Sequence, residues 1–468
     1  MRSVRTIIRP GAAFIAMLYA TVSVHAGGQG GQGGYGELNM NPYGYPGGNG
    51  NSATGMGGDG GQGYNNPDPT GAGGTVGNLI TSPTTIISNI TGGAGGRSVD
   101  QDGFGGNAGG GGTGVATASD VTNNATVIGG QGGAFSLGAW SGAGAGGAGG
   151  AGVATSANFT NNSTVIGGAG GDGANTSRGQ NSGGGGGGAG VYVVGNSTLV
   201  TITNNGTITG GAGGLNSAWP VYYGATGGAG EGGAAGSIRT GGSQGTSSQG
   251  GAGIIGANIA VINNGTITGG IGGTGGLNAG VQNDAVTFQS GTNSLTLTTK
   301  SVISGVVSAN GNDDTLTLQN TLSKIDGGQS DGANISATQY KGFEHLVVNG
   351  GRWTVGGSAI VSGETTLNGG ALVVTGPAAL GVQAITAQGG AIEASGDQVL
   401  NQSFVLKNNP YGASTSGLVV QGADNLVLSG VLSDVGRLTK NGSGTLTLTA
   451  DNTYTGGDGF RGRCCVCG

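Results

Sequence analysis

One phrase recurs in this chain and constrains the fold more than any other feature. It reads NNATVIGGQGG at residues 123–133, NNSTVIGGAGG at 161–171, NNGTITGGAGG at 204–214 and NNGTITGGIGG at 263–273. The paired glycines, with a fainter first copy, begin at residues 92, 129, 167, 210 and 269, so successive copies lie 37, 38, 43 and 59 residues apart. A phrase of constant length followed by a segment of variable length is typical of stacked repeats with insertions at one corner.

Each copy of the phrase contains two short β-branched runs separated by a polar turn. In VTITNNGTIT, Val200, Ile202 and Ile208 alternate with threonines. This period of two predicts strands, and Asn-Gly tolerates the positive φ of a tight turn. We therefore expect each copy to form walls of a parallel coil in which equivalent residues stack about 4.8 Å apart, asparagine over asparagine and valine over isoleucine.

Composition limits the classes of protein that this chain can be. Glycine supplies 118 of the 468 residues, and only 8% of the residues are charged. Ordering glycine costs more backbone entropy than ordering any other residue, so a compact α/β enzyme core is disfavoured and order must come from stacked repeats. The net charge of −6 and the absence of a basic stripe exclude nucleic-acid binding.

The chain divides into five parts. Residues 1–26 have the pattern of a secretory signal peptide, with a basic start, a short apolar run and VHA before the expected cleavage site. Residues 27–74 form a flexible glycine-rich lead-in. Residues 75–280 contain the glycine-rich β-helix repeats, and residues 281–457 have less glycine and longer alternating runs. Residues 458–468 read as an aberrant tail that holds all three cysteines.

Two stretches of the second half resemble a known family. LTKNGSGTLTLTADNTYTGG, at residues 438–457, resembles the passenger-associated strand repeat of bacterial autotransporters. GNDDTLTLQ at 311–319, followed by YKGFEHLVVNGGRWTV at 340–355, is similar to a phrase common in autotransporter passenger domains. The resemblance implies an all-β fold, a right-handed parallel β-helix (solenoid) with glycine-rich insertions. It also implies export across the inner membrane and a place at the cell surface or outside the cell.

The resemblance further implies a non-catalytic structural or adhesion protein. Family members are commonly adhesins, aggregation factors or surface scaffolds, so the expected partner is a host or bacterial surface ligand and no cofactor is expected. The family ends in an outer-membrane β-barrel, which needs many strands of about ten residues, and such strands do not follow residue 457. For a chain that stops before its barrel, the expected location is the periplasm.

Two other classes remain open from the sequence. Strings such as GGAGGAG at residues 146–152 are compatible with packed polyglycine helices, as in a glycine-helix surface mat, although the regular strands oppose that architecture for the whole chain. A polysaccharide-acting β-helix enzyme would need two facing carboxylates, and no pair of acidic residues stands out.

Trp219, Tyr222 and Tyr223 are the candidate binding residues. They lie together in NSAWPVYYG, within the longest insertion, and exposed aromatic side chains on a loop bind sugars or proteins. The alternative is that these rings pack against the side of the coil.

No catalytic residue and no metal ligand is assigned. His345 is the one histidine after the signal, and its neighbour Glu344 should point to the opposite face of an expected strand. GNDDTLTL at residues 311–318 is similar to a calcium-binding nonapeptide, but its leucine stands one position late. The cysteines of CCVCG crowd together without a histidine, unlike a four-ligand zinc site.

Overall fold

The computed structural model describes residues 71–97, 108–135, 145–173, 182–194, 198–216, 248–275, 279–322, 328–409, 416–461 and 464–466. The expected signal at residues 1–26 lies outside these segments, as does most of the expected lead-in at 27–74. The strands form five sheets, and the strands within each sheet are parallel. A short 3-10 helix, η1 (Pro377–Leu380), is the one helix of the described segments.

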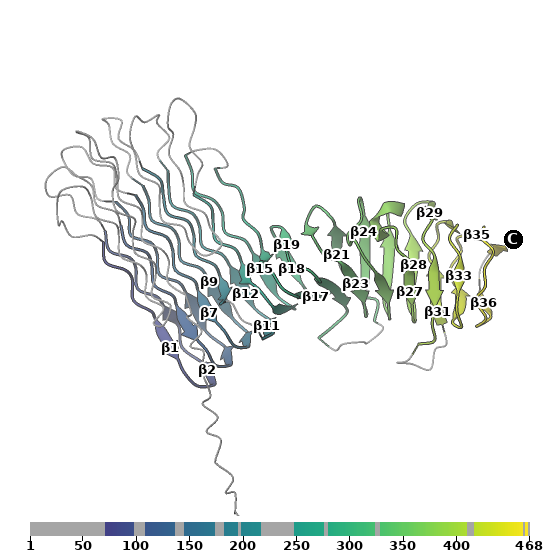
Figure 1. The fold of residues 1–468 in the computed structure, drawn as a ribbon, viewed down its shortest axis with the longest axis horizontal. Helices are drawn as coiled ribbons and strands as arrows, with labels where there is room; N and C mark the ends of the chain where they lie inside the picture. The colour runs from purple at the N-terminus through teal and green to yellow at the C-terminus, as the bar shows by residue number, and fades with distance from the viewer. Residues whose placement is uncertain are drawn as a thin grey trace, which may run out of the picture.

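Three sheets form the walls of the first part of a coil, and each rung passes through all three in turn (Figure 1). The eight-stranded sheet contains β1 (Asn78–Ile80), β4 (Val115–Thr117), β7 (Val153–Thr155), β10 (Val191–Val193), β13 (Ile254–Gly256), β16 (Val286–Phe288), β19 (Val307–Ala309) and β22 (Tyr340–Lys341). The six-stranded sheet contains β3 (Ile90–Thr91), β6 (Thr126–Ile128), β9 (Thr164–Ile166), β12 (Thr207–Thr209), β15 (Thr266–Thr268) and β18 (Val302–Ser304).

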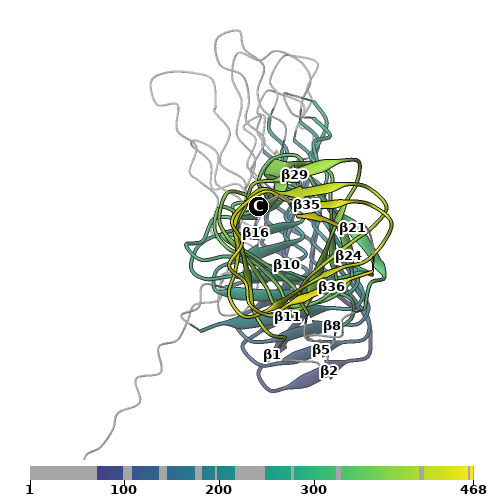
Figure 2. The same cartoon turned by 90° about the vertical axis from the view of Figure 1, so that its right-hand side faces the viewer.

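The third wall runs from the first rungs into the C-terminal part of the coil. This twelve-stranded sheet contains β2 (Thr84–Ile86), β5 (Val121–Asn123), β8 (Phe159–Asn161), β11 (Val200–Asn204), β14 (Ile259–Asn263), β17 (Ser294–Thr298), β20 (Thr315–Gln319), β23 (His345–Val348), β25 (Thr365–Leu367), β27 (Ile385–Ala387), β30 (Phe404–Leu406) and β33 (Leu432–Ser433). Seen from one end, the rungs are loops around a common interior (Figure 2). The predicted all-β parallel β-helix is confirmed.

Two further sheets join the coil in its C-terminal part. The seven-stranded sheet contains β21 (Asp331–Ser336), β24 (Arg352–Gly356), β26 (Ala371–Val374), β28 (Gly390–Ala394), β31 (Ser416–Gln421), β34 (Arg437–Lys440) and β36 (Asp458–Phe460). The four-stranded sheet contains β29 (Gln398–Leu400), β32 (Leu426–Leu428), β35 (Leu446–Leu448) and β37 (Cys464–Val466). Both β36 and β37 lie in the expected aberrant tail, so residues of that tail add one strand to each of these sheets.

A buried asparagine ladder follows the repeated phrase. Asn123, Asn161, Asn204 and Asn263 are fully buried and pair in register on neighbouring strands of the twelve-stranded sheet. Each Nδ2 donates to the Oδ1 of the next asparagine, at 2.9, 2.9 and 2.8 Å, across sequence offsets of 38, 43 and 59 residues. These offsets equal the spacing of the phrase, so the predicted stacking of asparagine over asparagine is confirmed.

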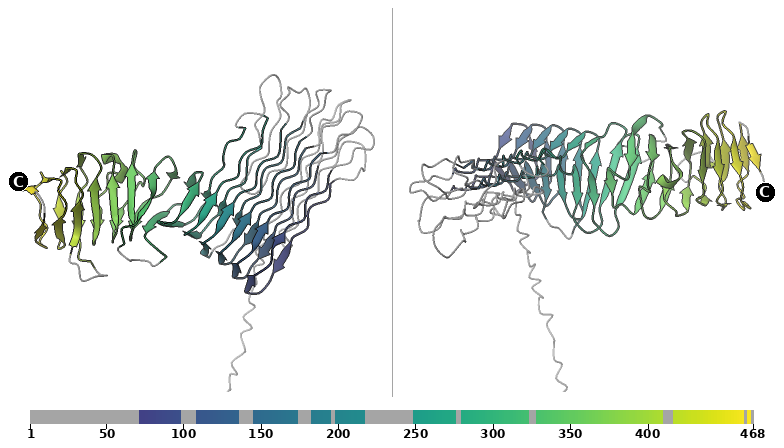
Figure 3. Two further views of the ribbon diagram at one scale, coloured as in Figure 1. Left: turned by 180° about the vertical axis from the view of Figure 1, so that it is seen from behind. Right: turned by 90° about the horizontal axis from the view of Figure 1, so that it is seen from above.

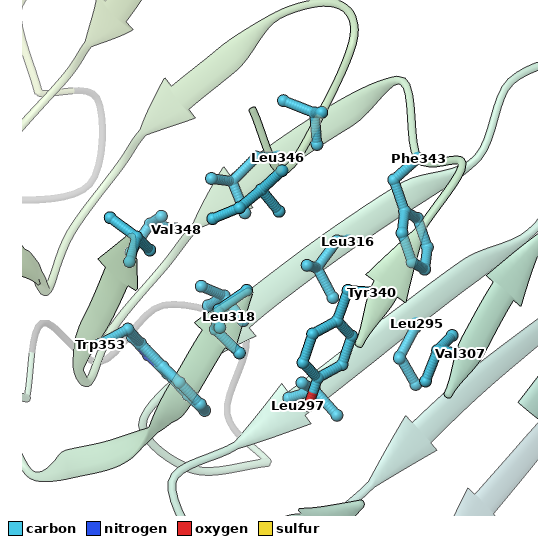
Figure 4. Close-up of a cluster of buried hydrophobic side chains, with 14 of the residues drawn as sticks. Leu295, Leu297, Val307, Leu316, Leu318, Tyr340, Phe343, Leu346, Val348 and Trp353 are labelled. Atoms are coloured by element: carbon cyan, nitrogen blue, oxygen red, sulfur yellow. The ribbon is translucent and has the colours of Figure 1, made fainter. Parts of the chain in front are cut away.

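The interior of the coil holds one hydrophobic cluster that extends from Ile80 to Leu448. Ile202 and Ile208 are completely buried, whereas the threonines beside them on β11 and β12 are partly exposed, as their alternation predicts. Figure 4 shows a later part of this cluster, where Trp353 and the leucines of successive rungs face one another. Burying each large aliphatic side chain contributes about 1.5–3 kcal/mol. Burial in the stacked interior therefore offsets the backbone entropy that is lost when the many glycines become ordered.

Candidate interaction surface

In the described part of the chain, ten glycine-rich strings extend the coil at the corner between the six-stranded and eight-stranded sheets. Outgoing strings follow strands of the six-stranded sheet, and return strings precede strands of the eight-stranded sheet. The outgoing strings are residues 92–96, 129–133, 167–173, 210–216 and 269–273, and the return strings are residues 71–77, 108–114, 145–152, 182–190 and 248–253. We call these strings the glycine array; Figures 1 and 3 show many of them running side by side beyond the strand ends.

Within each layer of the array, every third N–H bonds to the next rung. In the outgoing layer, Gly132 donates to the carbonyl oxygen of Ala169, and Gly170 donates to that of Ala212, both at 2.8 Å. In the return layer, Gly149 donates to the carbonyl oxygen of Gly186 at 2.9 Å. Hydrogen bonds that recur at every third residue on one side of a string require about three residues per turn, the repeat of a polyproline II helix.

A second set of hydrogen bonds joins the two layers. The N–H of Gly130 in the outgoing layer donates to Gly112 in the return layer at 2.6 Å. Gly150 in turn donates to Gly130 at 2.9 Å, and Gly168 donates to Gly150 at 2.7 Å. The bonds therefore zigzag between the layers from rung to rung. Two of every three residues in a string donate, which gives the backbone polar groups partners without any strand.

The close approach of strings in successive rungs explains why these positions are glycine. A Cβ atom on Gly168 would collide with the carbonyl oxygen of Gly130, and a Cβ atom on Gly150 would collide with that of Gly112. The obstacle in each case is backbone, which cannot rotate away as a side chain can. The array therefore needs glycine for the same steric reason as the axis of the collagen triple helix.

The third position of each Gly-Gly-X triplet accepts a side chain. Ala148 and Ala189 occupy this X position in the return layer and are buried, whereas Ala94, Gln131 and Ala212 occupy it in the outgoing layer and are exposed. The polyglycine-helix architecture that the sequence left open is thus present, as an extension of the β-helix rather than in its place. The Gly-Gly-X triplets, which repeat every three residues, are the sequence pattern that indicates these polyglycine helices.

The candidate binding residues Trp219, Tyr222 and Tyr223 lie outside the described residues. Their role stays a prediction. The insertion that carries them begins where the outgoing string 210–216 ends, and the return string 248–253 follows it. The glycine array, and not the group of aromatic residues, is therefore the candidate interaction surface among the described residues.

His345 and its acidic neighbours belong to a turn at the surface of the coil. The Nε2 atom of His345 lies 2.8 Å from the Oδ1 atom of Asp313, and both side chains are substantially exposed. Glu344 instead accepts the N–H of Asp314 at 2.7 Å. Glu344 and His345 therefore bind different residues of the turn, and no nucleophile joins the His345–Asp313 pair among their hydrogen bonds.

The phrase similar to a calcium site forms a closed hydrogen-bonded turn. Asp314 is fully buried, and its carboxylate accepts the N–H of Gly311 at 2.8 Å and the N–H and Nδ2 of Asn293 at 2.9 and 2.8 Å. Within the described ranges, no three His, Cys, Asp or Glu side chains form a group that could bind a metal ion.

A buried lysine marks the rung formed by residues 437–448. Lys440 on β34 points inward with Leu438 and is about 1% exposed. Its Nζ donates to the carbonyl oxygens of Asn441 and Gly442, at 2.6 and 3.1 Å. Gly442 has a φ of 81°, in the left-handed region that favours glycine. The charge is thus compensated by the turn that follows it, an arrangement that alternation alone did not reveal.

Comparison with known proteins gives one match. The family described as the passenger-associated-transport-repeat matches residues 438–458, the rung of Lys440 and its continuation into β36. No curated protein and no solved structure matches the chain. In the described part of the chain, no helix has the length and apolar character needed to span a bilayer.

Proposed function

This chain is an autotransporter passenger domain, and from that premise we propose that it acts as a non-catalytic structural and adhesion protein. Passengers are exported and act at the cell surface or outside the cell. The observation that carries the proposal is the filled interior: stacked apolar side chains occupy the coil from Ile80 to Leu448. Binding must therefore use the outer surface, and among the described residues the glycine array forms an extended part of that surface.

The architecture of the outer surface supports a scaffold rather than an enzyme. The array is built mainly from backbone hydrogen bonds and small residues, and its one carboxylate, that of Asp172, accepts the N–H of Leu215, so the array offers an extended surface rather than a set of paired catalytic groups. A second candidate, a glycine-helix surface mat, is favoured by the bonds between layers, because strings of the same kind could pack between molecules. Both candidate functions use an extended, non-catalytic surface. An adhesion protein binds a ligand on another cell, whereas a mat protein binds further copies of the same chain.

A bead-retention assay tests the proposed adhesion directly. Beads coated with the purified full chain should be retained on epithelial or Gram-negative bacterial cells several times more than uncoated beads or beads carrying heat-unfolded chain. The same preparation should release no product from a panel of ester, peptide and pectin substrates. Equal retention of all beads on every cell type would contradict adhesion. Hydrolysis that disappears in His345→Ala would contradict the non-catalytic assignment.

A further inference from the structure

We infer that four asparagines along one corner of the coil are attachment sites for sugars. Each directly follows an asparagine of the buried ladder and lies at the turn between a strand of the twelve-stranded sheet and the next strand of the six-stranded sheet. We call them the outer asparagines: Asn124, Asn162, Asn205 and Asn264. The first three are exposed and the fourth is partly exposed. This inference goes beyond the proposed adhesion role, and its test does not depend on adhesion.

Each outer asparagine begins an Asn-x-Thr motif. The four motifs are NAT at residues 124–126, NST at 162–164, NGT at 205–207 and NGT at 264–266. Asn-x-Ser/Thr without a central proline is the acceptor motif for N-linked sugars, which are bulky and need a place at the surface of an exported protein. The threonines of the motifs are partly exposed and pair in register on the six-stranded sheet: Thr126, Thr164, Thr207 and Thr266. Both motif residues therefore form rows along the outside of the coil.

Stacking of the coil does not by itself require the motif. In the first rung, Ile87 occupies the place of the outer asparagine, and an NIT motif with an exposed asparagine begins two residues later, at residues 89–91. In the rung after the fourth motif, Thr298 and Val302 occupy the places of the asparagine and the threonine. The coil thus forms without the motif at these positions, so the recurrence of the motif calls for another reason.

The hydrogen bonds along the outer asparagines leave room for a sugar on the amide nitrogen. The Nδ2 of Asn162 donates to the Oδ1 of Asn124, and the Nδ2 of Asn205 donates to the Oδ1 of Asn162, both at 2.9 Å. Asn162 thus donates toward one neighbouring rung and accepts from the other, so the donated hydrogen lies opposite its own carbonyl oxygen. The second hydrogen lies beside that oxygen, where a trans amide carries its substituent. A sugar can replace it without breaking these bonds.

The buried ladder shows which asparagines cannot carry a sugar. Asn161 also begins an acceptor motif, NNS at residues 161–163, but its side chain is completely buried. Its Nδ2 donates to the Oδ1 of Asn204 at 2.9 Å and to the carbonyl oxygens of Ser163 and Thr207 at 3.0 and 3.2 Å. The hydrogens of that amide are used inside the coil. The motif alone allows modification of both neighbouring asparagines, whereas the fold allows it at Asn162 only.

The attachment is a group transfer for which the cell supplies the enzyme and the donor, a sugar with a phosphate or diphosphate group on its anomeric carbon. The Nδ2 atom bonds to that carbon, the bond from the carbon to the phosphate oxygen breaks, and the phosphate leaves with the electron pair. Nδ2 gives one proton to a base of the enzyme, and nothing is oxidised or reduced. Neighbouring rungs lie about 4.8 Å apart, close to the thickness of a sugar ring, so short unbranched sugars are expected.

Peptide mapping by mass spectrometry tests the inference on the chain purified from the bacterium that produces it. Elastase fragments that contain the outer asparagines should be heavier by one or more sugar residues, and fragmentation that preserves the linkage should place each sugar on Nδ2. In the fragment that contains Asn161 and Asn162, the sugar should be on Asn162 alone. The same chain made in a laboratory strain that lacks a transferring enzyme is the unmodified control.

Thr164→Val and Thr164→Ser are the matched variants. Valine keeps the shape of the side chain but removes the hydroxyl group, so the sugar on Asn162 should be lost while that on Asn205 remains. Serine keeps the hydroxyl group and should keep the sugar. Unmodified outer asparagines in the native chain, a sugar on Asn161 instead of Asn162, or full modification of Asn162 in the valine variant would each overturn the inference.

A chain without residues 1–26, the expected signal, identifies the source of the sugar. Modification of this retained chain indicates a nucleotide-linked donor in the cytoplasm, and modification of the exported chain alone indicates a lipid-linked donor. Both results support the attachment sites, and modification of neither chain would contradict them. An unmodified chain that still adheres to cells would overturn this inference and leave the proposed function intact.

Discussion

Gly150→Ala is expected to open the glycine array between two rungs and to destabilise the chain by about 3 kcal/mol, as overpacking of a closely packed interior does. The added Cβ atom would collide with the carbonyl oxygen of Gly112 in the rung below, and backbone cannot yield as a side chain can. Limited proteolysis followed by mass spectrometry should find new cleavage in residues 108–114 and 145–152, and urea unfolding should show the loss of stability.

The matched control is Gly186→Ala, at an X position of the next return string. Its neighbours in the same rank are Ala148 and Gln249, which already carry side chains. This substitution should change stability by less than about 1 kcal/mol and could raise it, because alanine restricts the unfolded chain more than glycine does. If both variants resisted proteolysis equally, the distinction between X positions and the glycine positions that face a neighbouring string would be wrong.

Ile208→Asp is expected to have the largest effect of any substitution in the repeats. Ile208 is completely buried between Val165 and Ile267 of the neighbouring rungs. The change removes the apolar contribution of the side chain and buries a carboxylate without a partner, a combination that costs more than about 4 kcal/mol. Urea unfolding and sensitivity to protease should both reveal it.

Thr207→Asp is the control for that prediction. Thr207 is the neighbouring residue on β12, stacks between Thr164 and Thr266 and is partly exposed. A carboxylate there remains hydrated, so the expected cost is below about 1 kcal/mol. Equal protease sensitivity of the two aspartate variants would mean that the inward and outward faces of the strand have been assigned incorrectly.

The strands of the coil were predictable from sequence because their side chains carry the signal. Ile202 and Ile208 alternate with threonines, and that alternation decides which face is buried. The asparagine ladder followed from the constant phrase, since equal spacing in sequence becomes register in a stacked coil.

The glycine array and the buried lysine were harder to predict for physical reasons. The array is stabilised by backbone hydrogen bonds, and hydrophobic periodicity does not predict these. The period of three in the Gly-Gly-X triplets is the sequence pattern that indicates the array. Lys440 follows the inward alternation of Leu438, but its charge is tolerated because the carbonyl oxygens of the next two residues turn toward Nζ. That turn depends on the left-handed φ of Gly442, which hydrophobic alternation does not record.

Hydrogen exchange of the backbone amides, resolved residue by residue by NMR, tests the central claim that the glycine strings are ordered helices bonded into two layers. In the string 167–173, the N–H groups of Gly168 and Gly170 are bonded, and that of Ala169 between them points to solvent. The account predicts slow exchange at both glycines and fast exchange at Ala169, with the same period of three along the other outgoing strings. Uniformly fast exchange through these strings, as in a flexible glycine linker, would contradict it.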